Sequence, residues 1–131
     1  MDINVSVKQI SDSASQGTAR NHTVLCDRPQ EKGGTNAGAM GGEIFLMGLG
    51  GCFMSNLLAA ARARQSSATN FSVEITGQVD GTPLHFTAVH LQVSAEYQNR
   101  EEVEKLAVIA ERGCIVANTI KEAVKLTITV V

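Results

Sequence analysis

The sequence predicts an α+β fold in a single domain over residues 1–131, and three observations carry that prediction. Helical and strand-like patterns follow one another without the regular strand–helix–strand order of a doubly wound sheet. A chain of 131 residues has the length of one ordinary domain. The composition, 44% hydrophobic and 18% charged, is that of a globular protein rather than a disordered segment.

The N-terminal part of the chain predicts a β-hairpin followed by a loop. Residues 2–10 alternate between apolar and polar side chains, which is typical of a half-buried strand. After a turn rich in serine, residues 18–27 are expected to form the second strand. One face of that strand carries Arg20, His22, Val24 and Cys26. Five glycines and a proline then predict a loop over residues 28–42.

Residues 43–64 predict a long helix that is apolar on every side. Glu43 in its first turn and Arg62 in its last turn suit the helix dipole. Such a helix must be covered all round, and a chain of this size covers one side well but not both. The economical solution is a symmetric homodimer in which two copies of the helix pack together, with glycines such as Gly48 allowing close approach.

The remainder of the chain predicts three more strands and two more helices. In order, these are strands at 71–79 and 87–97 joined by a turn at 80–83, a helix at 100–112 that Asn99 caps and Gly113 ends, a helix from Cys114 to about residue 123, and a strand at 126–130. The helix at 100–112 has an apolar stripe of Val103, Leu106, Ala107 and Ala110, which we expect to be buried.

Charge and composition argue against several classes of partner. Eleven Lys and Arg against thirteen Asp and Glu leave no basic footprint for nucleic acid or anionic lipid. Residues 44–61 approach the length of a membrane span, but they are rich in glycine and alanine and are interrupted by Ser55 and Asn56. The N-terminus shows no secretory signal. We therefore expect a cytoplasmic protein that binds neither nucleic acid nor membrane.

The three cysteines are the residues best suited to chemistry. Cys52 lies in the middle of the long helix beside two glycines, which leave room around its sulfur, although it could equally be a buried core thiol. Cys114 opens a helix, where unpaired N–H groups are expected to lower the pKa of its thiol. Cys26 is expected to be structural. No residues have the spacing of a metal site, so no metal or other cofactor is expected.

Two cysteines in such settings suggest peroxide chemistry. A thiolate attacks a peroxide oxygen and becomes a sulfenic acid, and a second thiol converts that acid to a disulfide. The reaction needs a cation beside the first sulfur and an acid or donor for the departing alcohol, for which Arg20 and Glu43 are candidates. Nine helical residues separate Glu43 from Cys52 by about 13 Å, so Glu43 must act through another group or on a partner subunit.

The residues 42–52, which end in Gly50-Gly51-Cys52, resemble the glutamate-to-cysteine helix signature of the OsmC/Ohr superfamily, named for osmotically inducible protein C and organic hydroperoxide resistance protein. The loop from Asp27-Arg28-Pro29 to Gly33-Gly34 also fits. So does the stretch 110–114, which matches the second cysteine of the family. The resemblance covers roughly residues 17 to 131. The spacing of nine residues resembles that of the OsmC-like branch, and Ile115 stands in place of the proline that is common in the best-known branches.

This resemblance implies a thiol-dependent peroxidase that reduces organic hydroperoxides. The fold it implies is an OsmC-like intertwined homodimer, with two long central helices packed between β-sheets and active sites at the subunit interface. By analogy Cys52 is the peroxidatic cysteine and Cys114 the resolving one, with Arg20 (or its rival Arg28) and Glu43 completing the catalytic set.

The family needs no metal, haem or flavin, and its members are re-reduced by thiols, in some cases those of lipoylated proteins. Residues expected to line the pocket for the organic part of the substrate are Phe45, Leu49, Phe53 and Met54. One alternative is a non-enzymatic relative that binds a small apolar ligand in the same pocket. Another is a structural domain with inert cysteines.

Overall fold

Three α-helices and two three-stranded sheets make up the chain, which the computed structural model describes over residues 1–131. This mixture confirms the predicted α+β class. The chain divides into two units, Met1–Phe45 and Leu46–Val131. The expectation of one domain over the whole chain stays a prediction.

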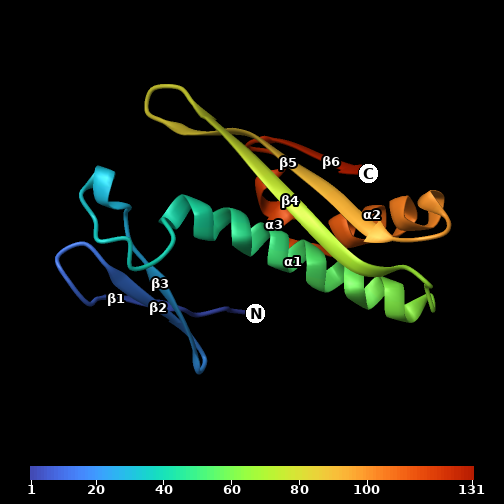
Figure 1. Ribbon diagram of the computed structural model, residues 1–131, viewed down its shortest axis with the longest axis horizontal. Coiled ribbons are helices and arrows are strands. Elements are labelled where there is room, and N and C mark those ends of the chain that lie inside the picture. The colour runs from blue at the N-terminus through green and yellow to red at the C-terminus, as the bar shows by residue number, and fades with distance from the viewer. The chain divides into compact units, whose positions relative to one another are not determined.

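The N-terminal unit is a three-stranded antiparallel sheet in the order β1-β2-β3 (Figure 1). Its strands are β1 (Ser6–Gln9), β2 (Ser15–Ala19) and β3 (His22–Cys26). The single strand predicted over 18–27 is therefore wrong. Ala19 pairs with His22 across a two-residue turn at Arg20 and Asn21, and Arg20 has a φ of 55° there. The alternating pattern runs through this turn, which is why the sequence did not reveal it.

Asp27 organises the loop that follows β3. Its carboxylate accepts the hydroxyl and the N–H of Thr35 and the N–H groups of Ala37 and Arg28, at 2.7 to 3.1 Å. The side chain is only 2% exposed. The Thr35 hydroxyl, followed by the N–H of Ala37, holds the pKa of Asp27 well below its ordinary value. One buried carboxylate thus fixes the path of the loop, which also contains the short 3₁₀ turn η1 (Gln30–Lys32).

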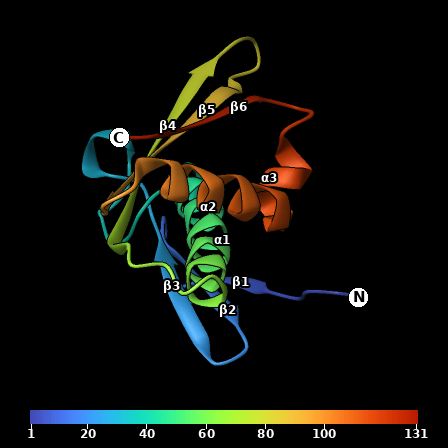
Figure 2. The same ribbon diagram turned by 90° about the vertical axis from the view of Figure 1, so that its right-hand side faces the viewer.

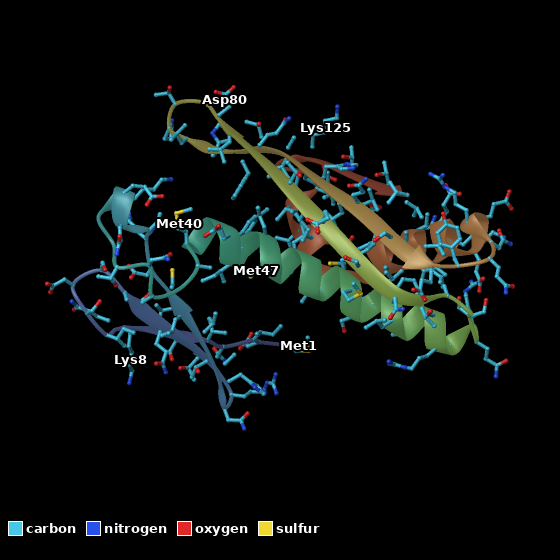
Figure 3. All side chains as sticks on the ribbon, viewed as in Figure 1. Met1, Lys8, Met40, Met47, Asp80 and Lys125 are labelled. Carbon is cyan, nitrogen blue, oxygen red and sulfur yellow. The ribbon has the colours of Figure 1, made fainter.

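The C-terminal unit combines one sheet with the helices. After α1 (Gly41–Ala63), which begins in the N-terminal unit, come β4 (Thr69–Asp80), β5 (His85–Glu96), α2 (Arg100–Gly113), α3 (Ile115–Ile120) and β6 (Lys125–Val130). β4 and β5 are antiparallel, and β5 and β6 are parallel. Both α1 and α2 lie on the same side of this sheet (Figure 2). Asp80 lies at the tip of the β4–β5 hairpin (Figure 3).

The core of the C-terminal unit follows the predicted patterns closely. The stripe on α2 is buried as expected, and the Asn99 side chain caps the helix by accepting the N–H of Glu101. Against α2 and the sheet pack the buried residues of α1, namely Leu49, Gly50, Phe53, Leu57, Ala60 and Ala61. The predicted helices and strands of this unit all exist, although the third helix stops at Ile120 rather than near residue 123.

The opposite face of α1 is uncovered within the chain. Met47 is 58% exposed and Leu58 is 40% exposed. A side chain at Gly48 or Gly51 would meet open space. By length and composition alone, α1 could cross a membrane, a test that core helices of soluble proteins also pass. An apolar helix face of this kind is ordinarily covered by other protein surface.

Replacing Asp27 by asparagine should lower the stability of the chain, because an amide cannot accept four hydrogen bonds as a carboxylate does. Because the pKa of Asp27 is lower in the folded state, its carboxylate contributes fully to stability at pH values above the ordinary pKa of an aspartate. That contribution is lost as pH falls through the folded-state pKa. Urea denaturation of wild type and Asp27→Asn at neutral pH measures the loss.

The matched control is Asp12→Asn, since Asp12 is exposed in the same unit. Equal denaturation midpoints for Asp27→Asn and Asp12→Asn would contradict the anchoring role of Asp27.

Candidate functional site

The structure brings two of the three cysteines together. Cys52 lies in α1 and is partly exposed, whereas Cys114 lies between α2 and α3 and is fully buried. Both belong to the C-terminal unit, and all three cysteines are free thiols. Cys26 is partly buried at the end of β3 in the N-terminal unit.

Close packing of α1 on the sheet positions Cys52. Two residues before it, a Cβ added at Gly50 would meet the end of the Ile75 side chain of β4, so α1 lies close to this strand and Ile75 would have to shift to admit a larger residue. Phe53, directly after Cys52, is fully buried. Gly51 and Ser55 are exposed. The Cys52 thiol therefore stands at the border between the buried and the open side of α1.

Cys114 is placed by the junction of two helices. α2 ends at Gly113 and α3 begins at Ile115, with Cys114 in extended conformation between them. Its sulfur caps α3 by accepting the N–H of Ala117 at 3.4 Å. The predicted position of Cys114 at a helix N-terminus is thus confirmed.

Hydrogen bonds to the Cys52 sulfur favour its thiolate. Burial alone would raise the pKa of Cys52. The N–H of Val116, the thiol of Cys114 and the N–H of Ile115 act against burial, and together they hold the pKa of Cys52 below its ordinary value. Cys52 is therefore the thiol of the pair that is set up as a nucleophile.

The prediction of a lowered pKa for Cys114 is wrong. Burial raises the pKa of the Cys114 thiol, and the N–H of Ala117 only partly offsets this effect. The neighbouring Cys52 raises it further, since a thiolate there favours a protonated donor at Cys114. The N–H groups at the start of α3 act on both thiols: those of Val116 and Ile115 lower the pKa of Cys52, and those of Ala117 and Val116 oppose the rise in the pKa of Cys114.

The backbone of Ile115 and Val116 is thus part of the site that sequence reasoning missed. The only signal for it was the helix start at Cys114, which revealed free N–H groups without revealing which sulfur they face. Since backbone groups carry no residue signature, only the packing of α3 against α1 identifies them.

The other predicted catalytic residues lie in the N-terminal unit. Glu43 is exposed and accepts the N–H of Met40 at 2.8 Å, so its carboxylate caps the start of α1. Arg20 is exposed at the β2–β3 turn. Arg28 lines a hollow with Cys26 and Lys32. Catalytic roles for Glu43 and for either arginine stay predictions.

The residues expected to bind the organic part of the substrate have different surroundings. Leu49 and Phe53 are fully buried in the core and contact no solvent within the chain. Met54 is partly buried, and Phe45 is 42% exposed. Substrate contacts for all four residues stay predictions, and Phe45 and Met54 are the two with accessible side chains.

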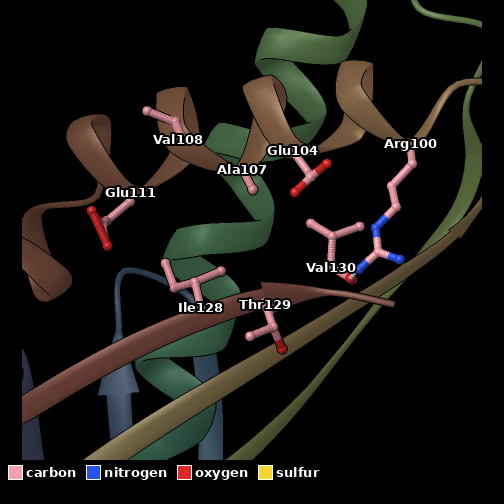
Figure 4. A pocket seen from close by; sticks show the side chains of 8 residues that line it. All are labelled: Arg100, Glu104, Ala107, Val108, Glu111, Ile128, Thr129 and Val130. Atoms are coloured by element: carbon pink, nitrogen blue, oxygen red, sulfur yellow. Dashed lines mark hydrogen bonds between the residues drawn. The ribbon is translucent and has the colours of Figure 1, made fainter.

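A separate hollow of about 340 Å³ lies between α2 and β6 (Figure 4). Arg100 crosses one end of it and donates a hydrogen bond to the carbonyl of Val130. Glu104 and Glu111 line the side formed by α2. No cysteine lines this hollow, and no group of three or more His, Cys, Asp or Glu in the chain could hold a metal ion. Cys52 and Cys114 are the two thiols that the structure brings together, and they form the candidate site.

Comparisons with known proteins point to one family. The family model described as OsmC-like protein matches residues 34–129. No curated protein matches the sequence. An OsmC-like protein from Mycoplasma pneumoniae is 16% identical with a TM-score of 0.87, over 100% of this chain and 96% of that one. An OsmC-like protein of unknown function from Vibrio cholerae is 14% identical with a TM-score of 0.84, over 100% and 99%.

A further similar structure is described as an organic hydroperoxide resistance protein OsmC from Legionella pneumophila. It is 20% identical with a TM-score of 0.77, over 99% of this chain and 96% of that one. At such low identity, the likeness of these structures shows a shared fold.

Replacing Cys114 by alanine should raise the pKa of Cys52, because the substitution removes a hydrogen-bond donor to its thiolate. A higher pKa leaves less thiolate at neutral pH. The alkylation profile should therefore move to higher pH, and a pKa higher by about 0.5 would slow alkylation at pH 7 about threefold. Iodoacetamide labelling, followed by peptide mapping of Cys52 across pH, measures the effect.

Cys114→Ser is the matched control, since its hydroxyl can still donate to the thiolate and should give a smaller change in the profile. Coincident profiles for wild type and Cys114→Ala would show that the two thiols do not interact.

Proposed function

The chain belongs to the OsmC-like protein family, and from that premise we propose that it is a thiol peroxidase that reduces organic hydroperoxides to alcohols. The observation that carries the proposal is the pairing of two thiols whose pKa values move in opposite directions. Cys52 is accessible and favours the thiolate, while Cys114 is buried and favours the protonated form. A nucleophile beside a protonated thiol is the arrangement that two-cysteine peroxide chemistry needs.

In the first step, the Cys52 thiolate attacks the terminal oxygen of the hydroperoxide. A sulfur–oxygen bond forms and the oxygen–oxygen bond breaks. The sulfur loses two electrons to become a sulfenic acid, and the departing alkoxide takes up a proton to become the alcohol. The N–H groups of Ile115 and Val116 support this step, because they favour the ionised form of Cys52.

In the second step, Cys114 attacks the sulfenic sulfur of Cys52. A disulfide forms and the hydroxyl leaves as water, using the proton of the Cys114 thiol. A thiol reductant then restores both cysteines, and two of its own thiols become a disulfide. Lipoylated proteins are reductants of the right chemistry. This cycle needs no metal, haem or flavin, and it suits the cytoplasm, where thiols stay reduced.

By the family resemblance, an arginine and a glutamate of the N-terminal unit also act in the proposed reaction. Arg20, or Arg28 in its place, stabilises the thiolate and orients the peroxide through its fixed guanidinium donors. Glu43 holds that arginine. Phe45 and Met54 contact the organic part of the substrate, because their side chains are apolar and accessible.

We propose that the active protein is a homodimer. Met47 and Leu58 are exposed on one face of α1, and the glycines at 48 and 51 leave that face flat. The N-terminal unit also exposes apolar strand residues, of which Val7 is 68% exposed. A second copy of the chain can cover the open face of α1 through a symmetric interface.

One equivalent of an organic hydroperoxide should consume two thiols of the reduced protein and produce a Cys52–Cys114 disulfide within one chain. Thiol titration and peptide mapping without reductant measure this outcome. Cys52→Ser should abolish peroxide consumption, because a hydroxyl is a far poorer nucleophile than a thiolate. Cys114→Ser should react once and then stop as the sulfenic acid, or become sulfinic acid with excess oxidant.

Cys26→Ser is the control and should leave the stoichiometry unchanged. Full activity in Cys52→Ser, or a disulfide through Cys26, would overturn the assignment. A protein that consumes no hydroperoxide but carries a bound fatty acid would favour the alternative of a ligand-binding relative.

Sedimentation at micromolar concentration should show a dimer, with an interface of more than about 2,000 Å² as in obligate pairs. Gly51→Leu should dissociate it, because a large side chain on the open face of α1 keeps two helices apart. The substitution meets open space within one chain, so the monomer should still fold. Gly41→Leu is the control, since it too meets open space but lies at the start of α1. A wild-type monomer would refute the dimer.

A further inference from the structure

We propose that Asn56 is a positioning residue that docks the α2–α3 junction onto α1 and so sets Cys114 and its neighbouring N–H groups against the Cys52 sulfur. The role in catalysis rests on the proposed function. The docking itself rests on two contacts of the Asn56 side chain, one within α1 and one to the end of α2.

The first contact ties Asn56 to the turn that carries Cys52. Asn56 lies four residues after Cys52, and its Nδ2 donates to the carbonyl oxygen of Cys52 at 2.9 Å. Asparagine is a poor residue for a helix interior because its side chain competes for backbone partners. Here the Asn56 side chain bonds to a carbonyl one turn earlier in α1, and this bond fixes the orientation of the amide. The Oδ1 atom of the amide then faces away from that carbonyl.

The second contact lies on the Oδ1 side and involves Gly113. A Cβ added at Gly113 would lie 2.7 Å from Asn56 Oδ1 and 3.4 Å from Asn56 Cγ. The last residue of α2 therefore packs directly on the amide. Gly113 has a negative φ, unlike Gly33 and Gly81, so backbone conformation does not require glycine at 113. The close approach to Asn56 disfavours a larger residue there, because a Cβ would force the amide to shift.

These two contacts place one side chain between the two parts of the thiol site. On one side it holds the turn of Cys52, and on the other it sets the distance of the residue before Cys114. The thiol of Cys114 and the N–H groups of Ile115 and Val116 follow directly in the chain. A change at Asn56 therefore moves all three donors relative to the Cys52 sulfur.

The test uses readouts that need no peroxide. Asn56→Ala should raise the pKa of Cys52 and slow its alkylation at pH 7 by about threefold or more, which corresponds to a pKa higher by about 0.5. It should also disfavour the Cys52–Cys114 disulfide by a similar factor in a glutathione redox buffer. Gly113→Ala should act in the same direction, although alanine is ordinarily better than glycine in a helix.

The double variant Asn56→Ala with Gly113→Ala should lose no more than Asn56→Ala alone, because the new methyl group no longer meets the amide. Such non-additivity identifies a direct contact. Ser55→Ala is the control, since Ser55 is the exposed neighbour on α1, and it should behave as wild type. Thermal unfolding of each variant identifies any that fails to fold. If Asn56→Ala does not fold, the measurements on Gly113→Ala decide the outcome.

Wild-type alkylation profiles and disulfide equilibria in folded Asn56→Ala or folded Gly113→Ala would overturn the proposal. Altered values in these variants would support it even if the wild-type protein consumed no hydroperoxide. The failure of the positioning role and the failure of the peroxidase are thus separate results.

Discussion

Ionisation of Cys52 depends on the contact between its sulfur and the α2–α3 junction. Burial by itself opposes ionisation of Cys52, so a thiolate is favoured there only if the donors around it outweigh that cost. Two of these donors are backbone N–H groups of Ile115 and Val116, which any residue except proline supplies at these positions. The packing of α1 against the sheet and α2 therefore serves the site directly, because it decides whether these groups reach the sulfur.

The same junction separates the roles of the two cysteines. Each sulfur is near the first N–H groups of α3, but Cys114 is fully buried and accepts the N–H of Ala117 at 3.4 Å. Cys52 is partly exposed and receives the neighbouring thiol as a donor. When two thiols share one proton, the proton stays on the sulfur whose ionisation costs more free energy. Burial thus divides one pair of like groups into a nucleophile and a proton-bearing partner.

The sequence allowed the C-terminal unit to be predicted more fully than the N-terminal one. A long run that is apolar on every side identified α1 and a periodic apolar stripe identified α2, and Asn99 and Gly113 marked the ends of α2 correctly. The turn at Arg20 was not predicted, because a non-glycine residue adopts a positive φ there. The alternation of polar and apolar residues also continues on both sides of the turn. The two cysteines of the site could be chosen from their settings. Their pKa order could not, because it depends on burial and on contacts between residues some sixty positions apart.

Enclosure of the Cys52 thiol links the proposed peroxidase activity to the proposed homodimer. An organic hydroperoxide is distinguished from hydrogen peroxide by burial of its apolar part, which contributes roughly 0.8 kcal/mol for each CH₂. The principal hollows of the chain are lined by residues other than Cys52. The sulfur stands instead at the edge of the open face of α1, beside Gly51. A surface that covers this face also encloses the thiol. In the proposed cycle, donors within one chain favour the Cys52 thiolate, whereas the proposed homodimer would supply the enclosure that selectivity for an organic substrate requires.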